Sequence, residues 1–180
     1  MTSSYTDISE RLGFMKLDHA AGQSLKEISA IVRDALPGVL EEFYTHVRGW
    51  PQVARYFGGD SVMNMAKNKQ VEHWSLILRG DFSQEYVTSV RRIGQTHARI
   101  GLEPRWYIAG YSFIMERVVA LIARHCQAKV FPPGVKFRSP ADRAKADAEC
   151  AAMNARYSGA FLRAALLDMD FAISIYLEEG

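Results

Sequence analysis

Residues 93–111 read IGQTHARIGLEPRWYIAGY, and this stretch decides how the chain folds. Apolar residues flank His97 at steps of four and three, which is the spacing of one helix face, so the imidazole is expected to point inward. These neighbours are Tyr86, Val90, Ile93 and Ile100. Gly101 then ends the helix, and Pro104 suits the first turn of the next one because the missing N–H would have no partner there. The stretch therefore predicts an inward histidine just before a sharp corner between two helices.

The remaining chain predicts further helices separated by glycine and proline corners. They are expected over about residues 6–14, 19–35, 38–49, 61–79, 83–100, 104–127 and 141–179. No segment shows the alternation of apolar and polar residues that is typical of a strand. The sequence therefore predicts an all-α fold, and its inward histidine and tight corners fit globin-like packing better than a simple up-and-down bundle.

Length and composition indicate one domain over residues 1–180. The chain is 48% hydrophobic and 23% charged, an ordinary globular balance, and its net charge of +2 is too small to favour nucleic acid as a partner. The N-terminus has neither a basic start nor an apolar signal region, and no uninterrupted apolar run of membrane-spanning length occurs. We therefore expect a cytoplasmic protein with no membrane partner.

The motif HARIGLEPRWY at residues 97–107 resembles the proximal-histidine corner of the globin-coupled sensors, the bacterial haem-based gas sensors, and of the related protoglobins. The Phe43-Tyr44 pair resembles their distal tyrosine segment. The likeness extends from about residue 8 to the last helix. It implies a globin-like fold with a short extra N-terminal helix and a long C-terminal helix, and a C-terminal output domain that this chain does not contain.

The resemblance implies that His97 is the axial ligand of a haem iron. Its second ring nitrogen would donate to an acceptor, for which the Ile93 carbonyl and the Tyr107 hydroxyl are both candidates. His73 is the competing ligand, although the corner motif does not surround it. The two cysteines, Cys126 and Cys150, form no haem-attachment motif, so the cofactor is expected to be non-covalent haem b.

On the distal side, the resemblance implies that the Tyr44 hydroxyl donates a hydrogen bond to a gas bound on iron. Phe43, beside it, and Met65, on the 61–79 helix, are further cofactor-binding candidates, and Met63 and Asn68 are also placed to line this side. For Tyr44 and Tyr107 the alternative is simple core packing, since aromatic residues on a helix face mostly fill volume.

The last helix is expected to be longer than the domain. Residues 141–179 would span about 58 Å at the rise of an α-helix, against about 40 Å for a compact domain of this size. Small and apolar residues form a seam along it that includes Ala165 and Met169, beside a second apolar line. Together with the resemblance, this predicts a homodimer through the last two long helices.

These observations lead to one preferred function and two alternatives. The preferred function is a haem-based sensor domain that binds O₂, or CO or NO, and signals through the dimer; catalysis would then belong to an output domain. One alternative is a haem-dependent NO dioxygenase or peroxidase, and the other is a haem-free globin scaffold. Either a stand-alone sensor or a fragment of a longer transducer agrees with the sequence.

Overall fold

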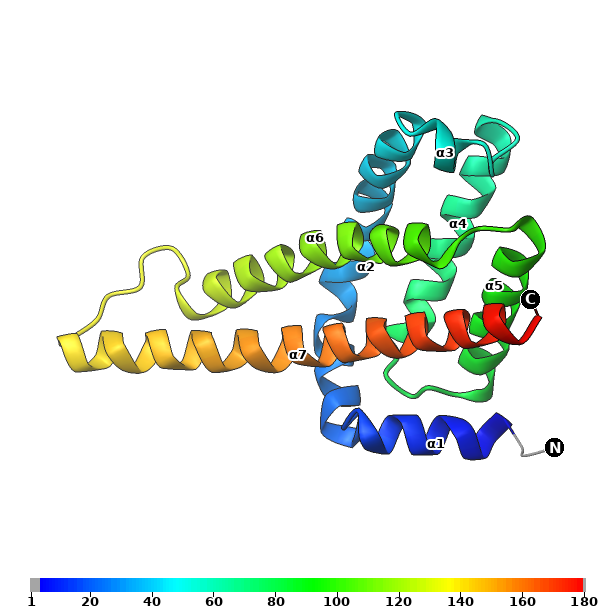
Figure 1. Ribbon diagram of the computed structural model, residues 1–180. Coiled ribbons are helices and arrows are strands. Elements are labelled where there is room, and N and C mark those ends of the chain that lie inside the picture. Colours follow the sequence, from blue (N-terminus) through cyan, green and yellow to red (C-terminus); the bar gives the residue numbers. More distant parts are fainter. Residues whose placement is uncertain (1–3, 180) are drawn as a thin grey trace.

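The computed structural model describes residues 4–179, which form seven helices (Figure 1). Their bounds are α1 Ser4–Phe14, α2 His19–Arg48, α3 Pro51–Ala54, α4 Asp60–Ile77, α5 Gln84–Ile100, α6 Pro104–Val130 and α7 Pro140–Glu179. Helix α7 packs against α2, α5 and α6, while α4 packs against α2 and α5. The all-α prediction and the long last helix are confirmed.

Helix α2 passes straight through Pro37, so the predicted division into two helices at this proline is wrong. The buried stripe Val32, Leu36, Leu40 and Tyr44 continues in register across the proline. Pro37 itself lies on the exposed side of α2, where water can satisfy the carbonyl group that has lost its backbone donor. The free energy gained by burying this stripe exceeds the free-energy cost of a proline inside the helix. As a result, a single helix extends to Tyr44 and on toward α3.

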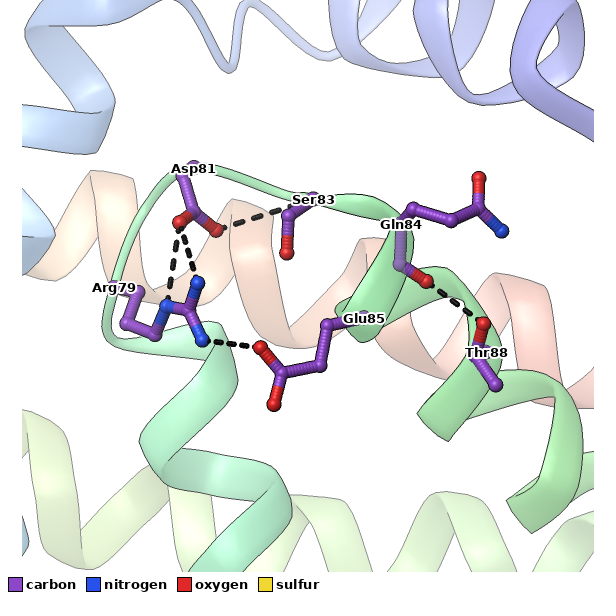
Figure 2. Close-up of polar contacts among 6 residues, drawn as sticks. All are labelled: Arg79, Asp81, Ser83, Gln84, Glu85 and Thr88. Atoms are coloured by element: carbon purple, nitrogen blue, oxygen red, sulfur yellow. Dashed lines mark hydrogen bonds and ion pairs between the residues drawn. The ribbon is translucent and has the colours of Figure 1, made fainter.

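A polar turn starts the helix that carries His97 (Figure 2). The carboxylate of Asp81 accepts the backbone N–H of Ser83 at 3.3 Å, while the Arg79 guanidinium donates to both Asp81 and Glu85. Glu85 lies in the first turn of α5, where a negative charge is favourable to the helix dipole. These contacts hold the turn after α4 against the first turn of α5 and so help to set the direction of α5.

The corner after His97 forms as the sequence predicts. Gly101 adopts φ 69° and ends α5, and its N–H donates to the carbonyls of Ala98 and His97. The left-handed conformation suits glycine because it has no side chain to clash with the backbone. Pro104 then occupies the first turn of α6. Two helices thus meet within a few residues of His97.

Helices α6 and α7 run side by side and extend together beyond the rest of the domain (Figure 1). Helix α6 is long and apolar enough to cross a membrane by length and composition alone. Its buried residues instead lie in the protein core, where α6 contacts α2 and α7. They are Tyr111, Ile114, Val118, Ile122 and Cys126.

The approach of α5 to α7 depends on Gly94, which lies one turn before His97. A Cβ atom at Gly94 would lie 2.9 Å from both the Ala172 carbonyl oxygen and the Ile175 Cβ. That spacing is shorter than a normal van der Waals contact, so only glycine fits without moving a helix. Gly94 therefore sets how closely the His97 helix lies against α7.

The predicted seam on α7 needs correction at Ala165 and Met169. Both residues are buried within the protomer, with exposed fractions of 0% and 7%. This part of α7 is therefore covered by other helices of the same chain. Leu162 and Leu166, one helical turn apart, are the exposed apolar residues of the same segment.

Candidate functional site

His97 lies in the last turn of α5, partly buried and directed at the first turns of α6. Its imidazole meets the Tyr107 ring edge to face, with 4.7 Å between the ring centroids. Burial lowers the pKa of His97 from 6.5 to about 4, and the charge of Asp168 opposes that shift. The imidazole is therefore neutral near pH 7 and has a lone pair available on one ring nitrogen.

Neither acceptor expected from the sequence is hydrogen-bonded to the His97 ring. Tyr107 instead directs its hydroxyl to the Tyr111 hydroxyl, at 3.2 Å. Within residues 4–179 the His97 ring donates no hydrogen bond, to the Ile93 carbonyl or to any other group. Tyr107 contributes its ring, and not its hydroxyl, to the surroundings of the histidine.

Tyr44 lies on α2 with only 2% of its surface exposed. Phe43 and Phe57 both meet its ring edge to face, with centroids 5.1 Å and 5.6 Å away. Burial raises the pKa of the Tyr44 hydroxyl, which therefore stays protonated and can donate a hydrogen bond. No acceptor for this hydroxyl occurs among the residues that the structure describes.

Two contacts connect the Tyr44 side of the molecule to the His97 corner. The Tyr56 hydroxyl, next in sequence to Phe57, donates to the carbonyl of Gly101 at 3.0 Å. On the other side, a Cβ at Gly110 would lie 3.2 Å from the Phe43 ring, and Gly110 is one turn beyond Tyr107 on α6. The aromatic pair and the histidine therefore adjoin neighbouring parts of the same α5–α6 corner.

The 61–79 segment contributes less than the sequence suggested. Met65 is 54% exposed on α4, whereas Met63 is buried in the core. The Gln70 side-chain oxygen is buried without a partner in the described chain, and it is a residue that sequence reasoning passed over. Gln70 lies among other polar residues, so no apolar spacing in the sequence predicts that its side-chain oxygen is buried. Only the packing of α4 in the structure shows this.

His73 is a core residue that is fully engaged by protein partners. Its Nδ1 lies 2.8 Å from Ser89 Oγ, and its Nε2 lies 2.7 Å from an Asp168 carboxylate oxygen. An iron ligand needs a free ring nitrogen, and here both nitrogens are occupied. Asp168, on α7, was not singled out from the sequence, because a single aspartate in an amphipathic helix looks like a surface residue.

Comparisons with known proteins show what the chain as a whole is similar to. The chain is 24% identical over 107 residues to the heme-based aerotactic transducer HemAT of Halobacterium salinarum. The aligned part is 59% of this chain and 22% of that protein, so the chain spans about a fifth of this curated relative. The globin domain of the Geobacter sulfurreducens globin-coupled sensor has the same fold, with a TM-score of 0.71 at 15% identity, over 93% of this chain and 96% of that domain. The protoglobin family matches residues 4–180, and this chain therefore belongs to the protoglobin family.

Proposed function

We propose that this chain is a haem-based gas sensor domain that binds O₂ reversibly at a histidine-ligated haem b. One juxtaposition carries the proposal: a neutral imidazole and the hydroxyl of a buried tyrosine, neither hydrogen-bonded to a described residue, adjoin one helix corner in a protoglobin-family protein. Neither group is used in a hydrogen bond to a described residue, so both remain available to a bound ligand.

The chemistry of His97 fits a haem iron. Axial ligation requires a neutral imidazole nitrogen, and burial keeps the pKa of His97 low enough to provide one at neutral pH. The Tyr107 ring, in edge-to-face contact, limits how the imidazole can turn. When bound, the haem iron would supply a site for a diatomic gas. The role of His97 is to hold that group from the α5 side.

Tyr44 would act on the opposite, distal side. Its hydroxyl stays protonated at neutral pH and is available as a donor, and the rings of Phe43 and Phe57 help to keep water from it. Bound O₂ carries partial negative charge, whereas CO carries much less, so a hydroxyl donor favours O₂. Such a hydrogen bond in a dry site contributes about 1 to 3 kcal/mol, which corresponds to roughly tenfold or more in dissociation rate.

The signalling part of the proposal concerns α6 and α7. The HemAT relative is described as an aerotactic transducer, which suggests that this domain also passes a ligand state to an output domain. We propose that it does so as a homodimer through α6 and α7, because these helices project from the globin core and retain exposed apolar residues. Residues 1–180 would form the sensor domain, and catalysis would belong to the output domain.

Reversible gas binding can be tested on purified protein reconstituted with haem. The reduced protein is exposed to O₂, flushed with argon, and followed by absorption spectroscopy through several cycles. We expect the oxygenated spectrum to appear and disappear with the gas. Immediate oxidation to the ferric form in every cycle would contradict the sensor proposal and favour oxidative chemistry instead.

A further inference from the structure

We propose that Asp168 is a positioning residue for the His97 imidazole, acting through Tyr111 and Tyr107 from the interior of α7. Asp168 has an exposed fraction of 0% and contacts side chains from two other helices. A carboxylate in the core is costly unless its oxygens are hydrogen-bonded, so its presence needs a reason beyond packing. The part that concerns haem rests on the proposed function above.

The two oxygens of Asp168 bind different helices. Oδ1 lies 2.7 Å from His73 Nε2 on α4, and Oδ2 accepts the hydroxyl of Tyr111 on α6. His73 is held in turn by Ser89 on α5, at 2.8 Å from Nδ1. One aspartate therefore connects α7 directly to α4 and α6, and through His73 to the helix that carries His97.

The hydrogen bonds from Tyr107 to Tyr111 and from Tyr111 to Asp168 link Asp168 to the surroundings of His97. A tyrosine hydroxyl has a single hydrogen to donate. Tyr111 gives its hydrogen to Asp168, so at its 3.2 Å contact with Tyr107 it must accept. The Tyr107 hydroxyl is thereby fixed as the donor, and its ring is held in the orientation in which it meets the His97 imidazole at 4.7 Å.

An asparagine side chain in place of Asp168 has nearly the same shape but only one acceptor oxygen, so it cannot accept from both His73 and Tyr111. If its oxygen accepts from His73, its NH₂ group faces Tyr111 as a donor, and Tyr111 must turn its own hydrogen toward Tyr107. If its oxygen accepts from Tyr111, His73 must change tautomer and accept at Nε2. In either orientation the charge-assisted hydrogen bond from Tyr111 is lost, so the hydroxyl chain that holds the Tyr107 ring against His97 is weakened.

The experiment compares Asp168→Asn with Asp170→Asn in the haem-loaded protein. Asp170 lies two residues along the same helix but pairs with Arg11, and its side chain is 50% exposed. No hydrogen bond joins Asp168 to His97, so the effect should be smaller than the tenfold or more that follows loss of a direct partner of a metal ligand, and Asp168→Asn should lose haem about two- to threefold faster. Its iron–histidine stretching vibration should also shift in resonance Raman spectra, whereas Asp170→Asn should match wild type. Unchanged haem loss and vibration in both Asp168→Asn and Tyr111→Phe would overturn the proposal.

Haem-free protein supplies an independent readout. The Tyr107 ring current shifts the His97 ring protons in NMR spectra, so Asp168→Asn should move those resonances and Asp170→Asn should not. If wild type takes up no haem, the proposed function fails, but this comparison still decides whether Asp168 positions His97. Should Asp168→Asn fail to fold, Tyr111→Phe removes the same link while leaving the His73–Asp168 pair intact, and His97 resonances unmoved by it would refute the proposal.

Discussion

His97 and Tyr44 show what a helix pattern can and cannot predict at the scale of one residue. The spacing of apolar neighbours predicts that both side chains point inward, and Tyr44 is indeed buried while His97 is partly buried. The pattern cannot show which of the inward polar atoms find partners. His73 illustrates the difference, because its two bonds to Ser89 and Asp168 involve residues far from it in the sequence.

Tyr44→Phe tests the distal role, since it keeps the ring and removes the hydroxyl. The hydroxyl has no protein acceptor in the described chain, so the free energy of unfolding should change by less than about 1 kcal/mol. The O₂ dissociation rate should rise roughly tenfold, and the CO dissociation rate much less. Stopped-flow measurements with both gases distinguish the two roles: equal responses to O₂ and CO, or no response, would mean that Tyr44 only packs.

At the scale of elements, the sequence predicted the helices around His97 better than those before it. Gly101 and Pro104 act locally, through backbone conformation, and both mark helix ends as expected. Pro37 also disfavours helix locally, yet α2 continues through it because the buried stripe on the other side of the helix is uninterrupted. Glycine and proline therefore predicted helix ends correctly where no long buried apolar face continued past them.

Gly94→Ala tests the close approach of α5 and α7. The added methyl would meet Ala172 and Ile175 at 2.9 Å, so the helices must separate, at a cost of about 1 to 3 kcal/mol in unfolding free energy. Chemical denaturation of the haem-free protein measures this cost. Gly38→Ala is the matched control, because Gly38 lies inside α2 with nothing within 4 Å of an added Cβ. Equal effects of both changes would contradict a close contact at Gly94.

A second contact between elements should depend on pH. Glu27 on α2 accepts the Tyr157 hydroxyl at 2.5 Å and the Arg156 guanidinium at 3.1 Å, both from α7. These hydrogen bonds, that of Tyr157 first, lower the pKa of Glu27 below 4.5. The unfolded chain then binds the proton more readily, so the stabilisation is complete above about pH 4.5 and is lost as the pH falls through the lowered pKa.

Glu27→Gln removes the charge while keeping an acceptor for Tyr157. Because Glu27 is half exposed, we expect the substitution to cost about 1 kcal/mol or less at pH 7. The difference from wild type should disappear below the lowered pKa of Glu27, where the wild-type carboxyl is protonated too. Unfolding curves recorded from pH 7 to pH 3 check this. A difference that stays constant across that range would contradict the charge-dependent contact.

At the scale of the whole molecule, length alone predicted that the last helix extends past the domain, and the paired α6 and α7 do so (Figure 1). The seam on α7 was assigned to the wrong face near Ala165 and Met169. A helix buried over a broad surface offers several apolar lines, and only the packing of α5 and α6 against it decides which line stays exposed.

Leu166→Glu tests the proposed dimer at a residue that the protomer leaves 45% exposed. A charge within an apolar interface is strongly unfavourable, so the variant should sediment as a monomer at micromolar concentration while wild type sediments as a dimer. The haem spectrum should stay nearly unchanged, because Leu166 lies away from the buried core. Phe14→Glu, at a residue 91% exposed at the end of α1 and outside the proposed interface, serves as the control and should sediment as wild type does. A monomeric wild type would contradict the dimer.

The axial role of His97 is tested most directly by the absorption spectra of wild type and His97→Gly after incubation with haem, recorded in the oxidised, reduced and CO-bound states. Wild type should bind one haem per chain with a sharp Soret band, and His97→Gly should lose that band. Added imidazole should restore the band, since it replaces the missing ligand in the space that the side chain leaves. A wild type that takes up no haem, or a His97→Gly variant with an unchanged Soret band, would contradict the assignment.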